Sequence, residues 1–218
     1  MTAEFEATPT PETEPDDEEN PGIRAGYTYL GQFIDHDLTF DPVSSLQREN
    51  DPKALEDFRT PQFDLDNIYG RGPSDQAYLY RADGLHMLLG DSLTGADNDP
   101  NARGVPRNRP FGTEPARALL GDPRNDENVI VSQLQAAILR FHNRVVDFTG
   151  AKDFEQAQNV VRFHYQWVVL NDFLKTIVGE ETWKAVLPNL AKGTTIKQDP
   201  PHLKVVKAGK WGGQMPVE

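Results

Sequence analysis

The chain has 218 residues, which is enough for one domain with a sizeable hydrophobic core or for two small ones. It contains no cysteine, which excludes disulfide bonds and thiolate metal sites. Its 34 acidic and 22 basic residues give a net charge of −12, which argues against a nucleic-acid-binding surface.

The acidic excess is concentrated at the N-terminus. Residues 2–20 hold eight carboxylates and no Lys or Arg, so the remainder of the chain has 26 acidic and 22 basic residues. We therefore predict a disordered acidic tract over residues 1–20. No apolar run approaches the ~20 residues of a membrane span. The N-terminus shows neither the basic region nor the apolar core of a signal peptide. The sequence therefore leaves the localisation of the protein undecided, with secretion among the alternatives.

Hydrophobic periodicity predicts three helices. The first spans about residues 27–38. The second follows the acidic residues Asp126 and Glu127, which suit a helix start, and keeps apolar residues at three- and four-residue steps as far as Phe148. The third spans about residues 153–178. With no convincing strand pattern, the sequence predicts a mainly α domain.

Long irregular connections separate these helices. Residues 41–83 and 92–116 are rich in Pro, Gly, Asp and Asn, and we predict loops there. No helical period is visible from residue 187 onward. Loops of this length in a compact domain are usually functional, so ligands or partners are expected along them.

The first predicted helix separates its side chains in an informative way. At ~100° per residue, Gln32, Asp35 and His36 lie together on one face, opposite an apolar arc that includes Phe33. Asp37 falls inside the apolar arc. An unpaired carboxylate there would cost several kcal/mol, so Asp37 needs a cation, either Arg or Lys or a hard metal ion. A hydrated surface helix is the alternative for the polar face.

Three motifs occur in a fixed order: GYTYLGQFIDHDLTF from residue 26, TPQFDLDNIYG from residue 60, and GDPRNDEN from residue 121, followed by FHNRVVDF in the next helix. Together they resemble the animal-type haem peroxidases of the peroxidase–cyclooxygenase superfamily, over roughly residues 20–218. The resemblance implies a haem-peroxidase-type helical domain with long irregular loops, and an enzyme that uses hydrogen peroxide and a small reducing substrate. It also implies haem b and Ca²⁺ as cofactors.

The resemblance assigns the distal haem face to this chain. His36 matches the distal histidine, Gln32 the residue that contacts halide or water, and Arg124 the distal arginine. Asp35 and Glu127 match the carboxylates that can form ester bonds to the haem. The chemistry suits these residue types, because an imidazole can move a proton between the peroxide oxygens and a guanidinium stabilises the charge that develops as the O–O bond breaks.

The resemblance also assigns a calcium site. Asp37 matches one ligand, and the loop ligands match the following residues: Thr60, Gln62, Asp64 and Asp66. Gln62 would contribute only its backbone carbonyl. A calcium ion on Asp37 would fix the residue next to His36 and so orient the histidine.

The proximal histidine pattern of the family, Arg-x-Gly-His, does not occur in this sequence. We therefore expect residues 21–218 to be the distal part of a peroxidase domain, with the rest of the domain following Glu218. Three alternatives stay open: a fatty-acid dioxygenase of the same superfamily, a calcium-stabilised helical fragment without haem, and a metal phosphohydrolase. The last lacks support, because the other histidines show no ligand spacing.

Overall fold

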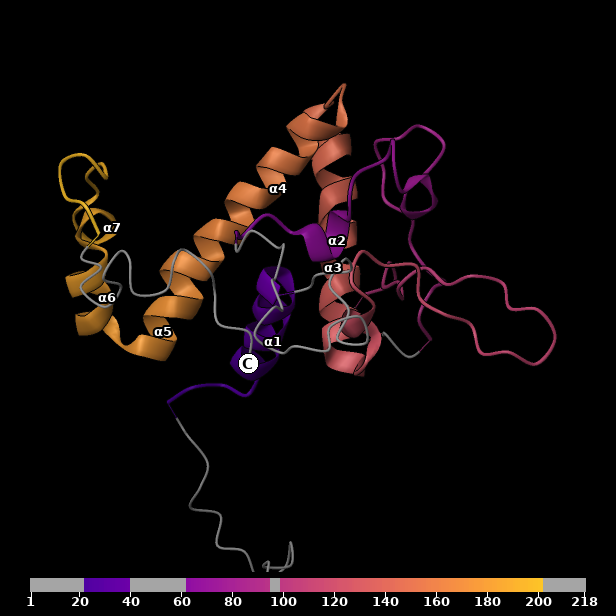
Figure 1. Ribbon diagram of the computed structural model, residues 1–218, viewed down its shortest axis with the longest axis horizontal. Coiled ribbons are helices and arrows are strands. Elements are labelled where there is room, and N and C mark those ends of the chain that lie inside the picture. Colours follow the sequence, from indigo (N-terminus) through magenta and orange to yellow (C-terminus); the bar gives the residue numbers. More distant parts are fainter. Residues whose placement is uncertain (1–21, 40–61, 95–98, 202–218) are drawn as a thin grey trace, which may run out of the picture.

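The computed structural model describes residues 22–39, 62–94 and 99–201, and within them the chain is mainly helical, as predicted (Figure 1). No extended strand forms in these residues, where β pairing is limited to three isolated bridges. The elements in chain order are α1 (Gly26–Thr39), α2 (Asp66–Tyr69), the 3₁₀ turns η2 (Ala77–Leu79) and η3 (Pro123–Asp126), α3 (Val129–Thr149), α4 (Phe154–Val168), the π-helical η4 (Val169–Phe173), α5 (Leu174–Val178), α6 (Glu180–Val186) and α7 (Pro188–Lys192).

The three predicted helices are confirmed, and their ends have local causes. Helix α3 begins where the Asn128 side chain accepts a hydrogen bond from the Val131 amide, and it ends at Gly150 in the left-handed conformation. Asp153 caps α4 in the same way through the Gln156 amide. No helix in the described part of the chain is long and apolar enough to cross a lipid bilayer.

Four features differ from the prediction. Residues 41–83 were predicted to be loop, yet the short helix α2 forms within them, and helix α6 was not predicted. The third predicted helix contains the π-helical segment η4, which hydrophobic periodicity does not reveal. We expected no helix from residue 187 onward, and this is wrong for the first residues of that segment, because α7 forms a short helix over Pro188–Lys192. Its proline suits a first helical turn. Helix α6 returns against η4, where the Trp183 indole donates a hydrogen bond to the Leu170 carbonyl at 2.6 Å.

One continuous core lies where α1 packs on α3, α2 and η4. Figure 1 shows α4, η4 and α5 as one long helical rod beside α1. Phe33 and Ile34 supply the α1 contribution, and Leu65, Ile68 and Tyr69 enter from the segment around α2. Fully buried side chains of this size stabilise the fold by about 1.5–3 kcal/mol each. The polar face of α1 is thereby directed toward η3 and the start of α3.

Histidines outside the predicted haem face take structural positions. His142 is fully buried, between the Tyr69 hydroxyl at 3.0 Å and the Leu85 carbonyl at 2.8 Å. The helical period over residues 153–178 places His164 on an apolar face and so predicts a hydrogen-bonded core residue. The hydrogen bond is present, to the Val160 carbonyl at 2.7 Å, but the core position is wrong. His164 is exposed, with its ring packed against Phe141.

Candidate functional site

The candidate site lies where η3 meets the second half of α1. Arg124 donates from Nη2 to the His36 carbonyl at 3.0 Å and from Nη1 to the Thr39 hydroxyl at 3.1 Å. Carbonyls in the last turns of a helix lack helical partners, so the guanidinium caps this end of α1. The fully buried Asp122 fixes the same guanidinium, with Oδ2 at 2.8 Å from Nη2. Asp122 also caps η3 by accepting from the Arg124 amide.

A chain of buried side chains sets the orientation of His36, which is only 5% exposed. His36 Nδ1 lies 2.7 Å from Asn125 Oδ1, and Asn125 Nδ2 donates to Gln135 Oε1 at 2.7 Å. Because Asn125 uses its amide as the donor to Gln135, the oxygen that faces His36 can only accept. His36 Nδ1 therefore carries the proton in the neutral ring, and Nε2 is the nitrogen that can accept another one.

The other residues predicted for the haem face are Gln32, Asp35 and Glu127. Gln32 accepts a hydrogen bond from Asn128 Nδ2 at 3.1 Å, so the residue that caps α3 also links it to α1. Asp35 and Glu127 are both exposed at the surface.

Apolar side chains follow Glu127 closely in the sequence. Val129 is 73% exposed and Ile130 45% exposed at the start of α3. An exposed apolar surface next to polar groups is typical of a place where another apolar body binds.

The predicted calcium ligand Asp37 is fully buried, as its position within the apolar arc of α1 predicted. Its Oδ2 accepts a hydrogen bond from the Leu65 amide at 3.2 Å, so the 62–66 segment does reach this carboxylate. Arg162 of α4 holds the segment from the other side, with Nε 2.6 Å from the Asp64 carbonyl and Nη2 3.8 Å from the Asp66 carboxylate.

These carboxylates do not converge on one point. Among the residues that the structure describes, no group of three or more His, Cys, Asp or Glu side chains is arranged to hold a metal ion. Thr60 lies outside the described residues, and Gln62 is exposed at the edge of them. The calcium site therefore stays a prediction, of which the structure supplies the buried carboxylate and the adjacent turn.

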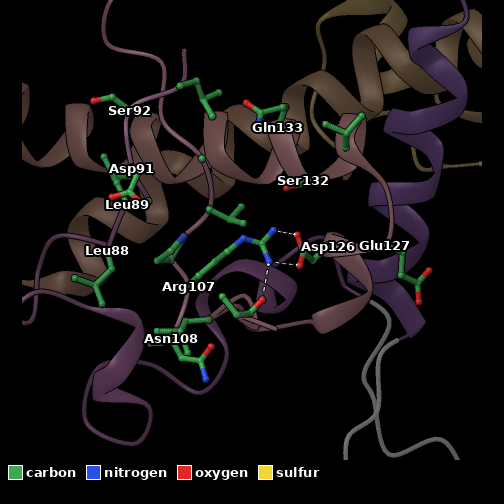
Figure 2. A pocket seen from close by; sticks show the side chains of 18 of the residues that line it. Leu88, Leu89, Asp91, Ser92, Arg107, Asn108, Asp126, Glu127, Ser132 and Gln133 are labelled. Atoms are coloured by element: carbon green, nitrogen blue, oxygen red, sulfur yellow. Dashed lines mark hydrogen bonds and ion pairs between the residues drawn. The ribbon is translucent and has the colours of Figure 1, made fainter. Parts of the chain in front are cut away.

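A cavity of about 850 Å³ lies beside the candidate site, between the 88–93 and 104–109 loops and the start of α3. Arg107 crosses it to Asp126, with Nη1 at 2.8 Å from Oδ2 (Figure 2). This contact raises the pKa of the Arg107 guanidinium above its ordinary value. Glu127 stands at the edge of the cavity, beyond Asp126 and directed away from Arg107 (Figure 2).

Sequence reasoning missed the residues that hold the site together. Asp122, Asn125 and Gln135 make the hydrogen bonds that fix Arg124 and His36, yet none of them was singled out. A signal existed for Asp122, because Asp directly before Pro favours a capped turn. Gln135 could have been found as a polar residue on the buried face of α3. Arg162 could have been found as a cation on the side of α4 that faces the core.

Comparison with known proteins identifies the class. The model of the animal haem peroxidase family matches residues 46–205, which is most of the chain. This chain belongs to that family. The match includes α3, α4 and the Arg124 and Glu127 segment, whereas α1 with His36 precedes it. No curated protein and no solved structure matches the chain.

Proposed function

We propose that this chain forms the distal side of the haem site of a peroxidase, which reduces hydrogen peroxide and oxidises a halide or a small organic substrate. The observation that carries the proposal is the contact between Arg124 and the backbone of His36, because it brings two motifs 88 residues apart in sequence to one place. Family membership supports a peroxidase-superfamily function for the domain.

The residues present fit a haem group. Val129 and Ile130 offer an exposed apolar surface, as a flat macrocycle requires, and the carboxylates of Asp35 and Glu127 are exposed as well. Those two carboxylates would hold the haem edge, with ester bonds as the family resemblance implies. When bound, haem supplies the redox chemistry, and the protein positions the reactants.

His36 and Arg124 have different roles in this proposal: His36 transfers protons, and Arg124 stabilises negative charge. With Nδ1 committed to Asn125, Nε2 of His36 is the atom that takes a proton from one peroxide oxygen and returns it to the departing one. Arg124, fixed by Asp122, provides positive charge where negative charge develops. Gln32 lies one helical turn from His36 and would contact the bound peroxide, water or halide.

Calcium is the second cofactor that we propose, with Asp37 as its anchor and Thr60, Gln62, Asp64 and Asp66 as the other ligands. The buried Asp37 carboxylate supports this, because burial holds its oxygen atoms at one position in the fold, as a metal ligand requires. The Leu65 contact shows that the segment bearing the other ligands can reach it. Calcium prefers oxygen ligands of this kind.

The test uses the protein expressed from its complete open reading frame. Hemin titration should give a Soret band, and stopped-flow mixing with hydrogen peroxide should give a fast second-order reaction. His36→Ala should keep the Soret band and slow the peroxide reaction by about 10²–10⁴-fold, because the base is lost. Unchanged kinetics in His36→Ala would remove the proposed role of this residue.

Asn125→Leu is the matched variant, because it keeps the base and removes only the acceptor for Nδ1. We expect a smaller decrease, about tenfold, together with a changed pH profile of the rate. If neither the wild type nor the variants bind haem, the non-enzymatic fragment is the better explanation. Oxygen uptake with a fatty acid, in the absence of added peroxide, would instead favour the dioxygenase.

A further inference from the structure

A second cavity, of about 790 Å³, lies away from the candidate haem face, against the second half of α3. Four guanidinium groups line it. Arg81 and Arg103 come from the loops, whereas Arg140 and Arg144 lie on successive turns of α3. We refer to these four residues as the arginine cluster. His86 lies beside them.

The nearby carboxylates neutralise only part of this charge. Asp99 pairs with Arg140 at 2.7 Å. Asp83 and Asp147 contact the two ring nitrogens of His86, at 2.6 and 3.2 Å. Within the described residues, the side chains of the other three members of the arginine cluster make no ion pair or hydrogen bond. Carboxylates are not scarce in this part of the chain, because outside residues 1–20 there are 26 acidic and 22 basic residues.

The arrangement has a free-energy cost when no anion is bound. Arg140 and Arg144 are four residues apart on one helix face, where like charges destabilise a helix, and the partly exposed Asp99 partner of Arg140 offsets only part of this repulsion. A bound anion would remove that repulsion. Guanidinium groups bind phosphate oxygens through paired N–H donors, and this fixed geometry suits an oxyanion better than a chloride ion.

One wall of the cavity is apolar. Leu89, Ala137 and Phe141 line it, and Phe141 is 37% exposed with its ring against His164. A free inorganic ion would leave this wall in water. An organic anion would place its charged group on the arginine cluster and its carbon skeleton on Phe141.

We propose that the arginine cluster is a binding site for a small organic phosphate monoester. The phosphate carries close to two negative charges at neutral pH, which matches several guanidinium groups better than a monocarboxylate does. This site does not depend on the proposed peroxidase function, because it lies on the other half of α3 and shares none of the residues of the candidate haem face.

Isothermal titration calorimetry of the purified chain with phenyl phosphate, at fixed ionic strength, tests the proposal. Arg81→Gln/Arg144→Gln should weaken binding by at least about tenfold, because two charge-assisted contacts are lost. Arg24→Gln/Arg117→Gln removes the same charge at exposed positions outside the cavity, and it should change the affinity by less than about twofold. Equal weakening in both double variants would overturn the proposal, because it would show a general charge effect.

Two further titrations test the ligand class. Benzoate, which has the same ring and one negative charge, should bind at least about tenfold more weakly than phenyl phosphate. Phe141→Ala should weaken phenyl phosphate but not inorganic phosphate. Equal binding of benzoate and phenyl phosphate, or no binding of phenyl phosphate to the wild type, would overturn the assignment. Thermal unfolding of each variant establishes that it is folded before it is titrated.

Discussion

Asp37 has a structural role in the fold, and we propose a second role for it as a calcium ligand. It is fully buried, and its Oδ2 receives the Leu65 amide. Leu65 has a φ of 60°, and it is the only non-glycine residue with positive φ in the described residues. That conformation costs about 1–2 kcal/mol for an L-residue. Two interactions offset this cost: the Leu65 amide donates a hydrogen bond to the Asp37 carboxylate, and the Leu65 side chain is completely buried.

We expect Asp37→Asn to separate the two roles. The amide oxygen can still accept the hydrogen bond from Leu65, so the variant should fold. With one negative charge fewer, its calcium affinity should fall by at least about tenfold. Thermal unfolding with added calcium and with a chelator measures this, since calcium should raise the Tm of the wild type and leave that of the variant almost unchanged.

Asp91→Asn is the control for this measurement, because it removes an exposed carboxylate outside the proposed calcium site. It should keep the wild-type response to calcium. A wild-type Tm that is the same with calcium and with chelator would refute the calcium proposal. An equal response in Asp37→Asn would refute the assignment of Asp37 as a ligand.

At the scale of elements, the helices could be predicted and their mutual docking could not. Periodicity and capping residues are local, so α1, α3 and the α4–α5 rod were visible in the sequence. The π-helical segment is stabilised by tertiary contacts, among them the hydrogen bond from Trp183, and such contacts leave no periodic signal. Helix α7 is only five residues long and has too few turns to show a period.

The candidate site was predictable in part for the same reason. The first-helix motif and the GDPRNDEN motif resemble the distal face of a haem peroxidase and so predicted that His36 and Arg124 belong to one site, and the structure brings Arg124 to the His36 backbone. The supporting contacts of Asn125 and Gln135 depend on how η3 lies across α1 and α3. That geometry results from side-chain packing between distant segments, and neither composition nor spacing encodes it.

Gly121 determines how closely η3 docks on α2. A Cβ atom at this position would lie 2.7 Å from both the Asn67 and the Asp66 carbonyl oxygens, which is too close for any side chain. The Asp122 amide donates to the Asn67 carbonyl at 3.0 Å across the same contact. The absence of a side chain therefore allows the Arg124-bearing turn to reach α1.

Gly121→Ala should push η3 away from α2 and destabilise the protein by roughly 1–3 kcal/mol, since a packed backbone contact must open. Urea unfolding monitored by circular dichroism measures the change. Gly104→Ala is the matched control, because its Cβ would meet nothing closer than 3.6 Å. A Gly121→Ala variant as stable as this control would show that the η3 contact is not tight in solution.

At the scale of the whole molecule, one buried cluster joins segments that are far apart in sequence. His142 of α3 lies between Tyr69 of α2 and the backbone of Leu85. The Leu85 carbonyl can only accept, so Nε2 carries the proton and Nδ1 accepts from the Tyr69 hydroxyl. Burial raises the pKa of Tyr69, which keeps the phenol protonated as a donor. The neutral forms of both side chains are therefore the ones that the fold requires.

This arrangement makes the stability of the fold depend on pH. Burial lowers the pKa of His142 below its ordinary value of 6.5. At pH values between the folded-state pKa and 6.5, His142 is protonated in the unfolded chain and neutral in the folded chain. The free energy of unfolding therefore falls as the pH decreases from 6.5 toward the folded-state pKa. Above the unfolded value, the contribution of His142 is complete and constant.

Urea unfolding at about pH 7.5 and about pH 5.5 tests this linkage. The wild type should lose stability at the lower pH. His142→Gln, whose amide can still donate to Leu85 and accept from Tyr69, should lose less, because no titratable group remains at that position. His164→Gln removes an exposed histidine and should keep the wild-type loss. An equal loss in the His142 and His164 variants would assign the pH dependence to other groups, and the buried cluster would then not control the acid stability of the fold.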